Sequence, residues 1–380
     1  MEESKAVQPA GMRQSNLELF RIISMLFILA HHYVVHGGLL SAGPVDTAPF
    51  SFHGQFLLLF GAWGKIGINC FVLITGYFMC TRSITLKKFL KLFCEILFYR
   101  ILALGIIAVT GYEQLTFAEV ADYLLPIRDL NADFYCGFLV FFLFIPFLNI
   151  LVRHMNEKTH VRLIALVTCV YILMATIPGF SVTLNNSIWF MVLYIISSYI
   201  RLYPKKIFDN RRFWGIAAGA CFLLSALSVI VCSRLGGVFD RDIKIAYHFV
   251  MDSNTLLAVL TALTAFMYFR NLRISQSRLI NTIASTTFGV LLIHANGHAV
   301  VRWLWTDLLH TLSSHETAFG YLHAILSVSA VFLIASFIDL MRIRFIEKPF
   351  FRLLDRVLPP VEERWKRLED KFFKKCHISS

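Results

Sequence analysis

The sequence predicts an all-α integral membrane protein with about ten transmembrane helices and both termini in the cytoplasm. Its 380 residues are 57% hydrophobic and only 16% charged, and the mean hydropathy is +0.66. A soluble domain carries roughly 25% charged residues, so a bilayer must cover much of this chain. The net charge is +12, but the basic residues recur in short runs between apolar stretches. This distribution is typical of loops that orient membrane helices and argues against nucleic-acid binding.

The predicted spans are windows of about twenty apolar residues. They cover residues 17–36, 55–79, 90–110, 134–152, 161–178, 188–203, 213–232, 254–270, 282–303 and 322–341. The loops between them alternate in charge, and the loops at 37–54 and 179–187 contain no Lys or Arg. The positive-inside rule therefore places the basic loops in the cytoplasm, and an even number of spans returns the chain to that side.

The spans divide the chain into three segments. Residues 1–16 form a cytoplasmic N-terminal segment, 17–345 a single transmembrane domain, and 346–380 a charged cytoplasmic tail. We expect the tail to be an amphipathic helix whose apolar residues lie at the membrane interface, namely Trp365, Phe372 and Phe373. The eight cysteines are scattered without a C-x-x-C pair, a pattern that supports neither a metal site nor a disulfide framework.

The first span contains two polar residues, Arg21 and His32, eleven positions apart. At about 100° and 1.5 Å per residue they share one helix face and lie ~16 Å apart. Ionisable residues within a span usually face the bundle interior or a watery cavity. An imidazole suits proton abstraction from a hydroxyl near neutral pH, and an arginine suits a phosphate. The alternative is that Arg21 snorkels to the headgroups and the histidine lies at the outer interface.

More basic residues surround the start of the third span. Lys87, Lys88 and Lys91 either form a cradle for a polyphosphate-bearing cofactor or simply determine topology. Arg100 lies deep enough in this span to need a partner. Glu95 is placed to pair with Lys91, four residues earlier on the helix.

Polar residues in later spans are candidates for substrate contact: Asn69, Trp189, His294 and Asn296. Asn69 is the residue of the second span that is hardest to explain by packing, whereas Trp189 is equally typical of an interfacial aromatic belt. His294, His298 and Arg302 repeat every four residues, which predicts one polar face on a continuous ninth span. Such a stripe usually lines a cavity.

Five of these features, in this order, resemble the membrane acyltransferase-3 family, the transmembrane O-acyltransferases that modify bacterial surface sugars. They are Arg21 and His32 as Arg-x10-His, Phe71-Val72-Leu73-Ile74-Thr75-Gly76-Tyr77, Trp189-Phe190, the stretch from Phe288 to His294, and Ile346-Glu347-Lys348-Pro349-Phe350. The resemblance covers residues 14–352. It departs from the family at Thr75, where a serine is usual, and by lacking an appended extracytoplasmic hydrolase-like domain.

The resemblance implies a ten-helix bundle in the plasma (inner) membrane that takes an acyl group, usually acetyl, from cytoplasmic acyl-CoA without a metal. The acceptor is implied to be a sugar hydroxyl of a surface polysaccharide, a lipopolysaccharide or a lipid-linked glycan. Arg21 and His32 match the pair that the family requires for activity. His32 would act as a general base or carry the acyl group itself. His294 and Asn296 are candidates for acceptor contact or for polarising the thioester carbonyl.

Two other function classes remain open from the sequence. A secondary transporter or flippase for a lipid-linked or acylated substrate usually needs an acid near the midplane and often has two related halves. Here Glu95 and Asp339 lie toward the ends of their predicted spans, and the chain shows no matching halves. A non-catalytic membrane scaffold is the third class.

Overall fold

The computed structural model describes residues 13–127, 134–180, 182, 184–239, 243–315, 319–356 and 359. Every secondary-structure element within these ranges is a helix, which confirms the all-α prediction. Seven helical segments are long and apolar enough to cross a membrane: Ser15–Ala42, Phe52–Met79, Leu86–Thr110, Phe134–His154, Glu157–Thr176, Arg211–Val238 and Gly320–Arg356. These segments identify a membrane protein.

The remaining three predicted spans also fall on apolar helices, but with different geometry. α11 (Asn186–Leu202) and α13 (Leu256–Arg270) are shorter than the other spans. The ninth predicted span is broken. Its first part, α14 (Arg278–Ala284) and α15 (Thr287–His294), is bent by 101° from the segment that follows it.

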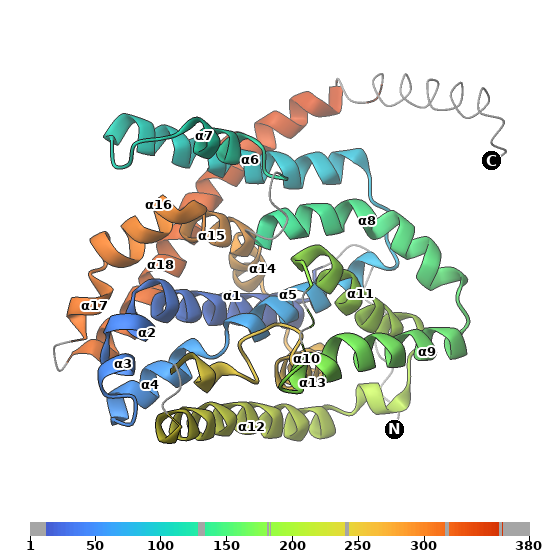
Figure 1. Cartoon of the computed structure of the whole chain (residues 1–380). Helices are drawn as coiled ribbons and strands as arrows, with labels where there is room; N and C mark the ends of the chain where they lie inside the picture. Colours follow the sequence, from blue (N-terminus) through green and yellow to red (C-terminus); the bar gives the residue numbers. More distant parts are fainter. Residues whose placement is uncertain are drawn as a thin grey trace.

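The centre of the bundle is α1 (Ser15–His36), which packs beside α5 (Gly64–Met79) (Figure 1). A Cβ atom on Gly67 would lie only 2.6 Å from the carbonyl oxygen of Ser24, so the small residue is what lets the two backbones approach. α4 (Phe52–Gly61), α13, α14, α15 and α18 (Gly320–Arg342) also contact α1. The helix that carries Arg21 and His32 is therefore surrounded by other helices.

The outer helices present apolar side chains to their surroundings, as lipid contact requires. They are α6 (Leu86–Thr110), α8 (Phe134–His154), α9 (Glu157–Thr168) and α12 (Arg211–Val238), seen at the edges of Figure 1, and the short α10 (Met174–Thr176). Val109 on α6 and Ile216 on α12 are 88% and 75% exposed. In a bilayer such residues face hydrocarbon.

Short elements connect the long helices. The α-helical ones are α2 (Leu39–Ala42), α3 (Pro44–Thr47), α7 (Phe117–Leu124), α16 (Gly297–Arg302) and α17 (Thr311–Ser314). Single 3₁₀ or π turns occur at Cys169–Leu173, Lys206–Asp209, Ile243–Tyr247, Trp303–Leu308 and Ile343–Glu347. The last of these continues α18 as helix to Arg356. The tail residues Trp365, Phe372 and Phe373 lie outside the described residues.

Candidate active site

Two histidines from distant parts of the sequence meet between α1 and α15. The Nδ1 atom of His294 lies 2.6 Å from the carbonyl oxygen of Val290, which can only accept, so Nδ1 carries the hydrogen. Neutral His294 then presents an Nε2 lone pair, 3.0 Å from Nδ1 of His32. His32 donates its Nδ1 hydrogen to that lone pair. The Nε2 atom of His32 is left with a lone pair of its own.

The surroundings hold this pair in a defined orientation. His294 is fully buried, and its ring packs edge-on against Trp305. The ring of His36 lies 4.8 Å from that of His32, centroid to centroid. The neighbouring His31 is bound through its Nδ1 atom, which donates to the carbonyl oxygen of Gly61 over 2.6 Å. The arrangement is that of a base whose tautomer is fixed by a second residue.

At the other end of α1, Arg21 lines a cavity of about 460 Å³. Its guanidinium bonds to Glu18 over 3.2 Å and lies over the ring of Phe71. The five basic residues of the lining are Arg13, Arg21, Arg82, Lys88 and Lys91, and its two acids are Glu18 and Glu95. An excess of cations in a concave site favours a polyanionic ligand.

The structure divides the three predicted lysines. Lys88 and Lys91 line the cavity with Arg21, whereas Lys87 points to Asp355, 2.5 Å away on the continuation of α18. Arg13 and Arg82 also belong to the cavity lining, although the sequence predicts for them only the role of basic loop residues that orient the spans. Both arginines lie directly beside spans that carry family motifs, and this position in the sequence could have marked them as site residues.

The expected ion pair between Lys91 and Glu95 is replaced by a larger network around Arg342. The Arg342 guanidinium bonds to Glu95 over 2.8 Å, to Asp339 over 2.7 Å and to Glu347 over 2.9 Å. Lys91 lies 2.5 Å from Glu347 instead. Arg342 displaces the expected pairing because it is buried and reaches three carboxylates at once. The network ties the closing motif, which contains Glu347, to the wall of the charged cavity.

Arg100 lies apart from the cavity lining. Its Nε atom donates to the carbonyl oxygen of Tyr123 over 3.0 Å, and its guanidinium lies over the ring of Tyr135, 4.9 Å from the centroid. The prediction that this deep arginine needs a partner is met by α7, which Arg100 attaches to α6. These contacts give it a structural explanation.

Asn69 and Trp189, two of the predicted substrate contacts, bond to each other. The indole Nε1 atom of Trp189 donates to Asn69 Oδ1 over 2.9 Å, and Asn69 Nδ2 donates to the carbonyl oxygen of Ser253 over 2.6 Å. Asn69 is fully buried. The pair connects α5 to α11, and neither residue lines the charged cavity.

The prediction that His294, His298 and Arg302 share one face of a continuous ninth span is wrong. The helix ends at His294, and Gly297 takes a φ of +79°, which turns the chain before α16 begins. His298 and Arg302 therefore do not continue the His294 face. Asn296, at the break, donates from Nδ2 to the carbonyl oxygen of Tyr99 over 2.7 Å.

A second histidine network surrounds Tyr33, one residue after His32 on α1, and the sequence does not predict it. The hydroxyl of Tyr33 lies 2.8 Å from His315 Nε2 and 2.7 Å from His323 Nδ1. His53 Nε2 lies 2.7 Å from His315 Nδ1. These residues come from α1, α4, the end of α17 and α18, so no spacing along the chain could reveal the network.

A family model described as an acyltransferase domain, that of acyltransferase 3, matches residues 14–339. The matched region includes Arg21, His32, His294 and most of the bundle. Searches among curated proteins and among solved structures found no match.

Proposed function

Since this chain belongs to the acyltransferase-3 family and is a membrane protein, we propose that it transfers an acyl group, usually acetyl, from acyl-CoA to a sugar hydroxyl. The acceptor in this proposal is a surface polysaccharide or a lipid-linked glycan, and the enzyme acts in the plasma membrane. The family supplies the acyltransferase activity. The cationic cavity supports a polyanionic donor, the histidine pair supports a hydroxyl acceptor, and the sugar follows from the family resemblance.

The donor fits the charged cavity at the Arg21 end of α1. CoA carries several phosphate charges, and the lining offers arginines for bidentate contact and lysines as point charges. The proposed topology places this end in the cytoplasm. From there the extended arm of CoA would run along α1 toward His32, ~16 Å away.

At the histidine pair, the Nε2 lone pair of His32 accepts the proton of the acceptor hydroxyl. The sugar oxygen then forms a bond to the thioester carbonyl carbon, the carbon–sulfur bond breaks, and the CoA thiolate recovers the proton from His32. His294 assists by accepting from Nδ1 of His32, since this contact stabilises the imidazolium that forms. In the second form of the proposal the same Nε2 forms a bond to the thioester carbonyl carbon, the carbon–sulfur bond breaks, and the CoA thiolate leaves with the Nδ1 proton of His32 as the thiol. The sugar oxygen then bonds to the acyl carbon, the bond to Nε2 breaks, and the hydroxyl proton returns to His32.

The observation that carries the proposal is the hydrogen-bonded pair of His32 and His294 on the helix that also lines the cationic cavity. One helix, α1, therefore carries both a base of fixed tautomer and part of a site for a polyanion. The transporter alternative would use Glu95 or Asp339 as its acid, but both are bound to Arg342. Asn69, Trp189 and Arg100 have structural explanations, so the proposal gives them no substrate role.

The test is mass spectrometry of surface glycans from cells that express the wild-type chain or the His32→Ala variant. We expect the acyl mass to disappear from the glycan in the variant, with unchanged protein in the membrane. His154→Ala is the matched control because His154 is exposed and its Nδ1 donates within its own helix, to Ile150. Normal glycan acylation by His32→Ala would overturn the mechanism.

A further inference from the structure

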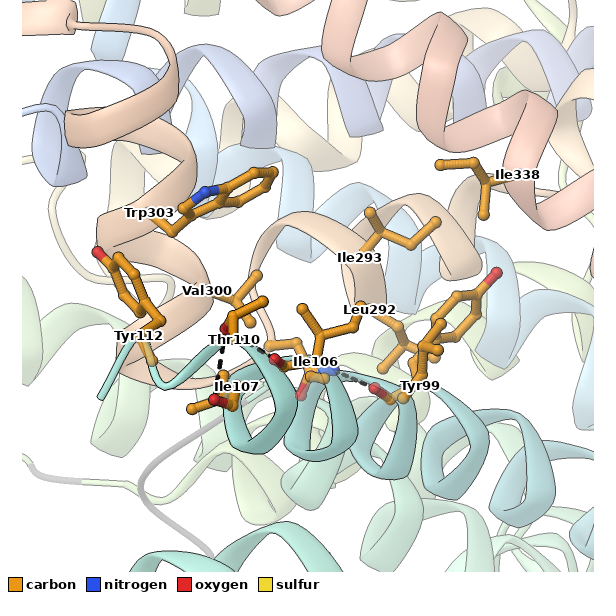
Figure 2. Close-up of a pocket in the computed structure, with 14 residues that line it drawn as sticks. Tyr99, Ile106, Ile107, Thr110, Tyr112, Leu292, Ile293, Val300, Trp303 and Ile338 are labelled. Carbon is orange, nitrogen blue, oxygen red and sulfur yellow. Dashed lines mark hydrogen bonds between the residues drawn. The ribbon is translucent and has the colours of Figure 1, made fainter. Parts of the chain in front are cut away.

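A second cavity, also of about 460 Å³, lies between α6, α15, α16 and α18 (Figure 2). Its wall is mainly aliphatic, with Leu102, Ile106, Leu292, Val300 and Ile338 among the lining residues. Leu292 precedes His294 by two residues, so it lies about 200° around α15 from it. Ile293, about 100° from His294, also lines the cavity, so the cavity lies beside the histidine pair and does not include it.

The outer wall of this cavity belongs to the lipid-facing surface. Ile106 is 55% exposed, Trp303 45% and Ile338 41%, and all three line the cavity. In a membrane protein these side chains contact hydrocarbon. A lipid chain can thus enter sideways from the bilayer, without crossing any polar layer.

The inner wall has one polar atom that the protein leaves unmatched. Asn296 is 2% exposed, and among the described residues its Oδ1 atom has no hydrogen-bond partner. Its Nδ2 atom is already bound to the carbonyl oxygen of Tyr99. A buried acceptor without a donor costs about 1–3 kcal/mol, which a ligand hydroxyl would recover. This favours a ligand with hydroxyl groups over pure hydrocarbon.

The rim of the cavity at its α16 end is formed by two aromatic side chains, Tyr112 and Trp303. Tyr112 lines the cavity, donates to Asp307 and accepts from Arg302 Nε over 3.1 Å. Arg302 also lies 3.6 Å from Glu113. The charged groups lie outside the cavity lining, and the two aromatic residues at the rim are of the kind that occurs at the membrane interface, where the sugar of a glycolipid lies.

We propose that this cavity binds the hydrocarbon chain of a neutral glycolipid, with the sugar against Asn296 and the rim. The glycolipid would be the acceptor of the proposed acyl transfer, so this inference deepens that function and rests on it for its biological meaning. Bilayer phospholipid and the acyl chain of a long-chain donor are the competing occupants.

The experiment measures binding without any donor, using a long-chain alkyl glucoside that carries a photoreactive diazirine in its chain. The purified full chain in nanodiscs is irradiated, and labelled peptides are mapped by mass spectrometry. We expect labels within residues 99–112 and 292–303, and at least fivefold less labelling in Ile106→Trp, which fills the mouth. The matched control is Val109→Trp, because Val109 is 88% exposed on the same helix and does not line the cavity.

Competition distinguishes the occupants. An unlabelled alkyl glucoside should displace the probe, whereas phosphatidylethanolamine and palmitoyl-CoA should not. Displacement by phosphatidylethanolamine to the same extent would show a general lipid site, displacement by palmitoyl-CoA alone a donor-chain site, and either would overturn the inference. Equal labelling of the Ile106→Trp and Val109→Trp variants would also overturn the inference, provided that both variants elute as folded protein. Because no acyl transfer is measured, glucoside binding can succeed where the proposed function fails, and the two failures remain distinct.

Discussion

The two cavities have the same volume and opposite chemistry, although they follow one another along the same helices. On α6 the charged cavity ends at Glu95 and the apolar cavity begins at Tyr99, one turn later. On α15 the corresponding residues are Phe288 and Leu292. The boundary is the hydrogen bond of 2.7 Å between Tyr99 and Asp339, which is anchored on Arg342. A single helix seam thus separates an ionic site from a hydrocarbon site within about 6 Å of rise.

The largest expected effect comes from a change that leaves both cavities intact. His294→Ala removes the group that orients His32, and we expect kcat to fall by at least about 100-fold with little change in KM for acyl-CoA. His294→Gln should recover part of the loss, because its amide oxygen can accept from His32 Nδ1. Steady-state kinetics on both variants would check this. A higher KM at unchanged kcat would assign His294 to substrate binding instead.

Arg21→Ala should affect the charged cavity alone. A charge-assisted hydrogen bond contributes about 1.5–3 kcal/mol, so we expect kcat/KM for acetyl-CoA to fall by about 10- to 150-fold. With acetyl-pantetheine, which lacks the phosphates, kcat/KM should fall far less. Glucoside labelling of the apolar cavity should stay unchanged.

The control for this change is Arg212→Ala, since Arg212 is exposed at the start of α12 and does not line the cavity. An equal loss with acetyl-CoA and acetyl-pantetheine would contradict a phosphate role for Arg21. It would indicate that the arginine acts on the packing of α1.

The third prediction concerns the helix break between α15 and α16, which follows His294. Gly297→Ala places a Cβ in the left-handed region, at a φ of +79°, and 2.8 Å from the hydroxyl of Tyr123. We expect the free energy of unfolding to decrease by about 1–2 kcal/mol in mixed micelles. Gly105→Ala should instead increase it by about 0.5–1 kcal/mol, because that position is helical and open. A stable Gly297→Ala variant would show that the break tolerates an ordinary residue.

Much of the architecture could be predicted because a bilayer imposes it residue by residue. All ten apolar ranges fall on helices, since backbone groups in hydrocarbon must be satisfied within the segment. The shared face of Arg21 and His32 follows from helix periodicity and holds in α1. The break after His294 could not be predicted in this way, because Asn296 and Gly297 lie inside an apolar run that is long enough to be one span.

The pairings of polar side chains could not be predicted, since they depend on how distant helices pack. His32 and His294 were both identified as candidates, but their contact joins residues 262 positions apart. Arg342 follows the last predicted span, where the positive-inside rule makes a basic residue a loop charge, yet it is buried among three carboxylates. The second network, around Tyr33, was invisible for the same reason. Local patterns identify polar residues within spans, whereas packing decides what they contact.

The smallest expected effect separates two adjacent lysines. Lys88 lines the charged cavity, whereas Lys87 is paired with Asp355 outside it. Exposed charge interactions contribute about 0.2–1 kcal/mol, so Lys88→Ala should raise KM for acetyl-CoA by about 1.4- to 5-fold and Lys87→Ala should leave it unchanged. The difference should diminish at high salt, which screens exposed charges. Equal effects of the two substitutions would mean that general positive potential, and not the cavity lining, attracts the donor.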